Sequence, residues 1–483
     1  MNRASEPSPN EARGARDLLL ELELRRGHMR HSLREALRTA IQDGRLNAGA
    51  VLPSSRRMAA DLGVSRGVVS DTYDQLVSEG YLKVKPRSAP VVAAVVAAPP
   101  PVVEHAPTNW RFDFNAVTPD VGLFPRRDWA RATERALRDA PHAALAYGDY
   151  RGRIELRIAL AAYLGRARGV RVDPGRIVVT QGFTQALDLL CRVLTDRGAR
   201  TLAMETPSHP DLRTTVTRSG LKLVGCPVDP DGLRTSELEA VNADAVVVAP
   251  AHQFPTGAVM APQRRAALVQ WAAAHDSLVI EDDYDAEFRY DRMPVGAVQG
   301  LDPGRVAHGG TASKTLAPGV RLGWISLPAN LVDDVRILKG VTDSGSPVVD
   351  QLAFAHLLTS GNYERHVVRA RHIYRRRRDR LVQALSTRLP RLEIRGAAAG
   401  MQLLLPLADE VDDVAIADAA ARRGIGLGAL SPLHLARNPE RGLLLGYGRL
   451  PETRISEAVD ALSSILIDAD AAHPPRSSPA RCE

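Results

Sequence analysis

One lysine of this 483-residue sequence stands in a segment suited to holding a phosphorylated aldehyde. Lys314 lies in residues 309–321, which read Gly-Gly-Thr-Ala-Ser-Lys-Thr-Leu-Ala-Pro-Gly-Val-Arg. A lysine that forms a Schiff base needs a rigid mount and small neighbours. The phosphate needs donors, and Thr311, Ser313 and Arg321 supply hydroxyls and a planar guanidinium fork. The segment therefore predicts covalent attachment of such a molecule to Lys314.

Two further polar segments could complete the same site. Gly182, Phe183 and Thr184 form a glycine turn that leads into a helix, so the backbone amides and the Thr184 hydroxyl can hold a phosphate. Asp282 follows a buried strand, where its carboxylate could keep a pyridine nitrogen protonated, and Tyr284 could bond the ring hydroxyl. Each pattern alone is commoner in ordinary loops. Their position after strands is where an open α/β sheet binds its ligand.

The elements that must position these residues alternate between residues 170 and 330. Short β-branched strands are expected at 177–180, 245–248 and 278–280, and helices at 185–194 and 262–275. This alternation predicts an α/β domain with a mainly parallel sheet covered by helices. A long arginine-rich helix and a smaller α+β segment follow from about residue 335. The arginines at 375–378 are interpreted as a solvated face of that helix rather than a DNA patch.

The first 92 residues predict a helix-turn-helix. A first helix ends near Gly44, a short helix spans 55–62, and Ser65 caps a second helix over 66–79. The inner face of the first helix carries Leu33, Leu37, Ala40 and Ile41. Met58, Ala59 and Leu62 face inward on the short helix, and Val69, Tyr73, Leu76 and Val77 do so on the second. Residues 81–85 and 90–92 can pair as a hairpin, the wing.

A basic surface surrounds the start of the second helix. We expect its first turn to enter the major groove of DNA and to expose Ser65, Arg66, Val68 and Ser70. Phosphate contacts are expected from Arg56, Arg57, Lys83, Lys85 and Arg87. The alternative is a small helical domain with a solvated basic face.

Composition limits the class of protein. We expect a DNA-binding domain at 26–92, a proline-rich linker at 93–109 and a larger domain at 110–470. The formal net charge of +7 weakly favours an anionic partner. The 3 cysteines fit neither a disulfide framework nor a metal cluster, so we expect no bound metal. The sequence predicts neither a signal peptide nor a membrane span, so we expect a cytoplasmic protein.

Motif details in both domains resemble known families. Residues 52–56, 62–66 and 73–82 closely resemble the GntR-type winged helix. Two departures are Gly67-Val68, where that family commonly has a polar pair, and a wing without Gly-x-Gly-Thr. Residues 110–470 resemble fold-type I aminotransferases, which bind pyridoxal 5'-phosphate. The matching segments occur in that family's order at 147–152, 180–182, 254–257, 282–284 and 313–314.

The second resemblance implies a homodimer with cofactor sites near the subunit boundary. Tyr147 matches a residue that reaches the phosphate of the neighbouring subunit. His209 lies where related sequences often carry a tyrosine and could approach the ring. His252 could contact the ring or the substrate side. For both histidines, simple loop packing is an equal alternative.

The order of domains resembles the MocR group of GntR-family regulators. The resemblance implies a regulator that binds operator DNA and responds to pyridoxal phosphate, an amine or an amino acid, and one branch controls vitamin B6 synthesis. The alternative is a working aminotransferase with an accessory DNA-binding domain. The arginine that grips a substrate carboxylate is replaced by Leu444, with Arg213 and Arg449 as candidate substitutes. The sequence does not reveal the operator, the effector, or whether transcription is activated or repressed.

Overall fold

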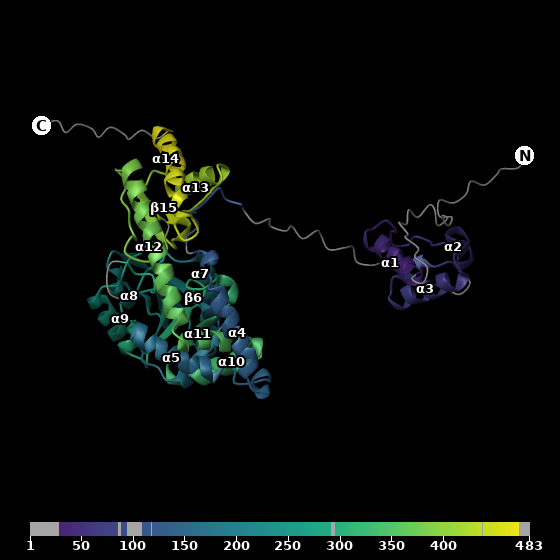
Figure 1. Ribbon diagram of the computed structural model, residues 1–483, viewed down its shortest axis with the longest axis horizontal. Coiled ribbons are helices and arrows are strands. Elements are labelled where there is room, and N and C mark those ends of the chain that lie inside the picture. The colour runs from purple at the N-terminus through teal and green to yellow at the C-terminus, as the bar shows by residue number, and fades with distance from the viewer. Residues whose placement is uncertain are drawn as a thin grey trace, which may run out of the picture. The chain divides into compact units, whose positions relative to one another are not determined.

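A computed structural model describes residues 29–85, 88–93, 109–116, 118–290, 295–436 and 438–472. The chain divides into two units, residues 1–108 and 109–483 (Figure 1). Arg87 and residues 94–108 of the expected linker lie outside the described residues. The two units are therefore treated separately below.

The amino-terminal unit is a winged helix-turn-helix. Its elements are α1 (Met29–Gln42), α2 (Ser55–Leu62), α3 (Arg66–Ser78), β1 (Leu82–Lys83) and β2 (Val91–Val92). The Ser54 side chain accepts the Arg57 N–H at the start of α2, and Gly63 ends this helix in the left-handed conformation. β1 and β2 pair antiparallel, with Lys83 opposite Val91. The predicted helices and wing are thus confirmed.

The core of this unit is apolar and joins all three helices to the wing. It contains the buried side chains Leu33, Leu37, Ala40, Ile41, Leu46, Leu52, Met58, Ala59, Val69, Tyr73, Leu76, Leu82 and Val92. The prediction that Val77 of α3 faces inward was wrong, because its side chain is 37% exposed. Thr72 is buried instead and donates its hydroxyl to the Val68 carbonyl oxygen at 2.7 Å.

The carboxy-terminal unit contains the remaining helices. They are α4 (Arg126–Asp139), α5 (Ile154–Arg168), α6 (Phe183–Asp196), α7 (Pro210–Arg218), α8 (Leu238–Val241), α9 (Pro262–Ala274), α10 (Val332–Asp343), α11 (Val348–Thr359), α12 (Asn362–Arg388), α13 (Asp413–Arg422) and α14 (Ile455–Ala472).

The strands of this unit form one large sheet and two small ones. They are β3 (Phe112–Asp113), β4 (Ile177–Thr180), β5 (Thr201–Thr206), β6 (Lys222–Asp229), β7 (Gly232–Leu233), β8 (Ala245–Val248), β9 (Leu278–Asp283), β10 (Val306–Thr311), β11 (Gly323–Ser326), β12 (Gln402–Leu407), β13 (Ile425–Gly426), β14 (Gly428–Ala429) and β15 (Arg441–Gly446). Within the described residues, the large sheet has 8 strands in the order β4-β11-β10-β9-β8-β5-β6-β7. Neighbours from β10 to β6 pair parallel, whereas β11 runs antiparallel to both of its neighbours.

Helices cover both faces of the large sheet because its strands are apolar on both sides. Val178 of β4 joins the core formed with α6 and α10, whereas Ile177 and Val179 join the core formed with α5 and α11. Successive strand residues point to opposite faces, so one continuous apolar strand can serve both layers. The arrangement confirms the predicted mainly parallel α/β fold (Figure 1).

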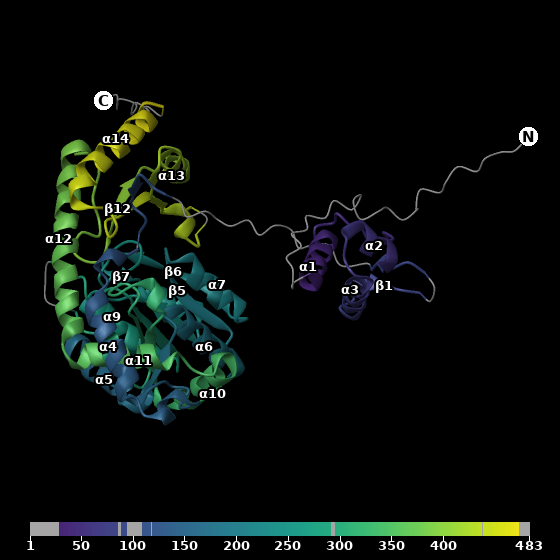
Figure 2. The same ribbon diagram turned by 45° about the vertical axis from the view of Figure 1, so that its right-hand side comes forward.

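The smaller subdomain packs β12, β15 and β14 as an antiparallel sheet against α13 and α14. Figure 2 shows α12 running along one side of the unit, from the sheet layers to this subdomain. Leu381 and Leu385 of α12 are buried in the same core as Val459 and Leu462 of α14. This is the α+β segment that the sequence predicts.

The arginine run of α12 is only partly solvated. Arg376 is exposed and pairs with Glu452. Arg377 is buried, donates to the Gly448 carbonyl oxygen and contacts Asp120 at 2.7 Å. The guanidinium of Arg378 lies over the Tyr290 ring, 5.0 Å from its centroid. The interpretation of a fully solvated face was therefore wrong for these two arginines, which fix α12 to the rest of the unit.

Candidate functional site

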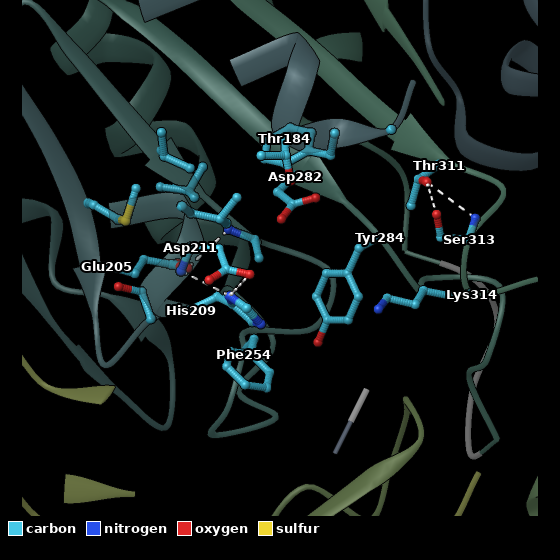
Figure 3. A pocket seen from close by; sticks show the side chains of 18 of the residues that line it. Thr184, Glu205, His209, Asp211, Phe254, Asp282, Tyr284, Thr311, Ser313 and Lys314 are labelled. Carbon is cyan, nitrogen blue, oxygen red and sulfur yellow. Dashed lines mark hydrogen bonds and ion pairs between the residues drawn. The ribbon is translucent and has the colours of Figure 1, made fainter. Parts of the chain in front are cut away.

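A cavity of about 270 Å³ lies at the carboxyl ends of the large sheet (Figure 3). It is lined by Gly182, Phe183, Thr184, Met204, Glu205, Ser208, His209, Asp211, Leu212, Val247, Val248, Ala249, Phe254, Asp282, Tyr284, Thr311, Ser313, Lys314, Pro318 and Arg321. The structure thus brings together all the predicted cofactor residues except Tyr147 and His252.

Lys314 stands on a loop that is anchored on both sides. Before it, Thr311 ends β10 and donates its hydroxyl to the Ser313 hydroxyl at 2.9 Å. After it, the Thr315 hydroxyl accepts from Tyr363 at 3.0 Å. Burial lowers the pKa of the Lys314 amine, and the Asp285 and Asp282 carboxylates oppose that change. A buried amine with a lowered pKa is more often neutral, which is the state that attacks an aldehyde.

Asp282, at the end of β9, presents an unsatisfied carboxylate to the cavity. Its Oδ1 atom is buried and has no hydrogen-bond partner among the described residues. Burial, together with the neighbouring Asp283 and Asp285 carboxylates, raises the pKa of Asp282 well above its ordinary value. A cationic N–H donor in the cavity would satisfy this oxygen and favour its ionised form.

The turn before α6 and the Lys314 loop meet around Arg321. Gly182 has a φ of 104°, and a Cβ on Gly323 would lie only 2.6 Å from the Gly182 Cα, so both positions require glycine. Arg321 donates to the Gln181 carbonyl oxygen at 2.5 Å. The start of α6 therefore faces the cavity with its amide groups beside a guanidinium, an arrangement that suits an anion.

His209 and Tyr284 contribute two rings to the cavity wall. His209 caps α7 by accepting the Asp211 N–H at its Nδ1, and its ring centroid is 5.5 Å from that of Phe254. Burial lowers the pKa of His209. In Figure 3 the Lys314 side chain points toward the Tyr284 ring.

His252 does not line the cavity but lies against Tyr284. Its Nδ1 is 3.0 Å from the Tyr284 hydroxyl oxygen and within 3.1 Å of both carboxylate oxygens of Asp285. The sequence could not distinguish a histidine in the cavity from one behind its wall.

Tyr147 lies away from the Lys314 cavity. It is 90% exposed and lines a separate cavity of about 520 Å³ that also contains Asp149, Arg153 and Ser346. Within this chain it does not meet the other cofactor residues.

The three positions considered for binding a substrate carboxylate all make other contacts within the protein. Leu444 of β15 is buried in an apolar cluster with Leu404, Leu430 and Leu433. Arg213 donates to the carbonyl oxygens of Pro432 and His434 at 2.9 and 3.1 Å. Arg449 pairs with Asp113 at 2.7 Å. Among the described residues that line the cavity, Arg321 is the only arginine.

Glu205 was not predicted from the sequence, although it lines the cavity and is only 5% exposed. Its Oε2 accepts the Ala249 N–H at 3.1 Å, and its Oε1 has no hydrogen-bond partner among the described residues. Burial raises the pKa of Glu205 to about 7. In the sequence, Glu205 is a single carboxylate near the end of an apolar strand, and no motif marks such a residue as part of a site.

The winged helix exposes most of its predicted DNA-binding residues. Ser65 caps α3 by accepting the Val68 N–H at 3.4 Å. Arg56, Ser65, Arg66, Lys83 and Lys85 are exposed, whereas Val68 and Ser70 are half-buried. The exposed start of α3 therefore lies in one small domain with basic side chains of α2 and the wing.

The described residues contain no helix long and apolar enough to cross a membrane. They also contain no group of three or more His, Cys, Asp or Glu side chains that could hold a metal ion.

Comparison with known families matches both units. Residues 30–92 match the bacterial regulatory proteins of the gntR family, and residues 111–461 match aminotransferase class I and II. The probable rhizopine catabolism regulatory protein MocR of Rhizobium meliloti is 33% identical, over 91% of this chain and 94% of MocR. The HTH-type pyridoxine biosynthesis transcriptional regulator PdxR of Corynebacterium glutamicum is 32% identical, over 89% of this chain and 95% of PdxR.

Solved structures match the carboxy-terminal unit. The kynurenine aminotransferase of Pyrococcus horikoshii, determined in complex with PMP, has a TM-score of 0.69 and is 26% identical. The match covers 76% of this chain and 92% of the enzyme.

Proposed function

The chain belongs to the MocR-type regulators of the GntR family, and on this basis we propose that pyridoxal phosphate bound at Lys314 controls its binding to DNA. The observation that carries the proposal is the buried, unpartnered Oδ1 of Asp282 in a cavity that also holds Lys314. A protonated pyridine nitrogen is a cationic N–H donor that would satisfy such an oxygen. The carboxy-terminal unit is an aminotransferase-like effector domain in this proposal.

The residues of the cavity fit the cofactor at each of its polar groups. Lys314 supplies the amine for covalent attachment. Asp282 holds the proton at the ring nitrogen, and Tyr284 meets the ring hydroxyl. Gly182, Phe183, Thr184, Thr311, Ser313 and Arg321 hold the phosphate. When bound in this way, pyridoxal phosphate can withdraw electrons from an attached amine.

The winged helix carries the DNA-binding function. We place Ser65, Arg66, Val68 and Ser70 near the base edges, and Arg56, Lys83, Lys85 and Arg87 at the phosphates. A homodimer would present two such helices, so its operator would contain two half-sites. Tyr147 would reach the cavity of the partner subunit, which accounts for its 90% exposure in one chain.

The effector is pyridoxal phosphate itself or an amine attached to it. PdxR is named for pyridoxine biosynthesis, and this supports a role in the supply of vitamin B6. Leu444 supports the same choice, because an apolar cluster cannot grip the carboxylate of an amino acid. Transaminase activity is therefore weak or absent.

Operator binding by the full-length protein tests this function. We expect pyridoxal phosphate to change the affinity for the protein's own promoter region by roughly 5-fold to 150-fold, the usual range of allosteric coupling. Lys314→Ala should remove this response and keep DNA binding. A DNA affinity that is indifferent to every cofactor state would contradict the proposal.

The second candidate function is an active aminotransferase with an accessory DNA-binding domain. It is favoured by the intact Lys314 loop and by the match to aminotransferase class I and II over residues 111–461. Rapid multiple turnover with an amino acid and a keto acid would establish it.

A further inference from the structure

We propose that His252 and Asp285 are positioning residues that make the Tyr284 hydroxyl a hydrogen-bond donor toward the ring oxygen of the cofactor. The inference rests on the proposed binding of pyridoxal phosphate at Lys314 and adds a proton arrangement to it. Asp285 follows β9 directly, and His252 lies in the loop after β8, which pairs with β9. All three side chains are buried.

One nitrogen of this cluster faces three oxygen atoms. The Nδ1 of His252 is 3.0 Å from the Tyr284 hydroxyl oxygen, 3.1 Å from Asp285 Oδ1 and 3.0 Å from Asp285 Oδ2. It can carry only one proton, and the location of that proton decides what Tyr284 can do.

The buried carboxylate of Asp285 determines the tautomer. A lone pair on Nδ1 would face both carboxylate oxygens, and the Asp285 charge would be left without this partner in the protein interior, which is costly. A proton on Nδ1 removes the repulsion and gives Asp285 a donor within 3.1 Å of either oxygen. His252 is therefore an Nδ1–H donor to Asp285.

This arrangement removes one acceptor for the Tyr284 proton. The hydroxyl cannot donate to an Nδ1 that is already protonated, so the acceptors left to it are the Asp285 carboxylate and a ligand oxygen in the cavity. Burial and the Asp285 and Asp282 carboxylates raise the pKa of Tyr284, so the hydroxyl stays protonated. Tyr284 also lines the cavity. The imidazole N–H already compensates the Asp285 charge, so the ring oxygen of the bound cofactor is the acceptor that draws this proton into the cavity.

The imidazole is held by packing as well as by hydrogen bonds. A Cβ on Gly400 would lie 2.0 Å from the His252 Cε1, so the ring rests directly on the backbone of that glycine. The Gly400 carbonyl oxygen in turn accepts from the Tyr290 and Tyr447 hydroxyls at 2.6 and 2.7 Å. The Gly400 backbone therefore supports one side of the ring, and a side chain at this position would displace the imidazole.

Five variants of the full-length protein test the inference through the dissociation constant of pyridoxal phosphate and its visible absorption band. Asp285→Asn lets the imidazole protonate at Nε2 and accept from Tyr284 at Nδ1, which turns the hydroxyl proton away from the cavity. Tyr284→Phe removes the donor. We expect each to weaken binding roughly 10-fold to 100-fold, as the loss of a hydrogen bond to a charged group does, and to shift the band in the same direction. Asp285→Asn should add nothing in the Tyr284→Phe background.

The role of the imidazole is tested by two substitutions of His252. His252→Asn, which can still donate to Asp285, should retain more affinity for pyridoxal phosphate than His252→Phe.

Asp413→Asn is the matched control, because Asp413 is a buried aspartate that accepts hydrogen bonds from Ser431 in the small subdomain. It should lower stability without moving the absorption band. Independent effects of Asp285→Asn and Tyr284→Phe, or an unchanged band in Asp285→Asn, would overturn the inference while the proposed function stands. If wild-type protein gives no borohydride-reducible band, the proposed function itself fails.

Discussion

Asp282 and Asp283 are adjacent in β9, but their carboxylates lie in different surroundings. Asp283 accepts from Arg168 at 2.7 and 3.0 Å and contacts His308 Nε2 at 2.9 Å. Although burial favours its neutral acid, Arg168 and His308 hold the pKa of Asp283 below its ordinary value. Asp282 has a buried oxygen without a hydrogen-bond partner among the described residues. The alternation of a strand thus separates a structural carboxylate from one available to a ligand.

Substituting these two residues should separate ligand binding from stability. Asp283→Asn leaves the buried Arg168 without its ion-pair partner and should lower the free energy of unfolding by about 3–5 kcal/mol. Asp282→Asn should weaken pyridoxal phosphate binding and leave the cofactor-free protein at least as stable as wild type. Urea unfolding and absorption titrations measure both effects. Equal losses of cofactor affinity in the two variants would contradict the assignment of Asp282.

Lys314 should be the residue that borohydride fixes to pyridoxal phosphate. Wild-type protein is expected to show a visible absorption band, and reduction should leave the modified lysine in the peptide that contains Lys314. Lys314→Ala should lose the band, whereas the exposed Lys222→Ala should keep it. A reducible band retained in Lys314→Ala, with the modification mapped to another lysine, would refute the site.

The order of polar segments after strands is why Lys314, Asp282, Thr311 and Arg321 could be predicted to lie together. Residues that depend on packing could not be predicted in the same way. The ion pair of Arg377 joins it to Asp120, 257 positions away in the chain, so its burial has no local signature. The contact of His252 with Tyr284 likewise exists only because two strands pair. Val77 fits the helical period of the inward-facing residues, but its side chain is exposed, because burial also requires another element to pack against that position.

Glu205 should make stability depend on pH. Its ordinary pKa is 4.5 and burial raises it to about 7, so the folded state holds a proton that the unfolded chain has lost. Ionisation therefore costs stability increasingly between pH 4.5 and 7, by about 3 kcal/mol in total. Glu205→Gln should gain stability relative to wild type as the pH rises through this range. Denaturant unfolding at pH 5 and 8 measures the gain, and an equal difference at both values would show that the carboxyl is not perturbed.

DNA contacts of the winged helix should fall into two classes. Arg66→Ala should cost about 1–3 kcal/mol and should do so selectively for the preferred sequence, because it removes a contact to a base. Lys83→Ala should weaken binding to all sequences and lower the salt slope by about 0.9, because it removes a phosphate contact. Gel shifts over a range of salt concentrations distinguish them. Full operator binding by a protein that lacks residues 1–108 would disprove the assignment.

Transamination of common α-amino acids should be slow or absent. At Leu444, where the arginine that holds the substrate carboxylate is expected, the structure has an apolar cluster with Leu404 and Leu430. The loss of a charged hydrogen bond should remove several kcal/mol from substrate positioning, on the order of 10²-fold or more in rate. Control of DNA binding needs only about 1–3 kcal/mol of differential affinity, so it can persist without efficient catalysis. One preparation can test both, because half-reactions with amino donors are followed by absorption and operator affinity is measured with and without pyridoxal phosphate. Fast half-reactions with amino acids would show that the Leu444 position does not limit catalysis and that another group holds the carboxylate.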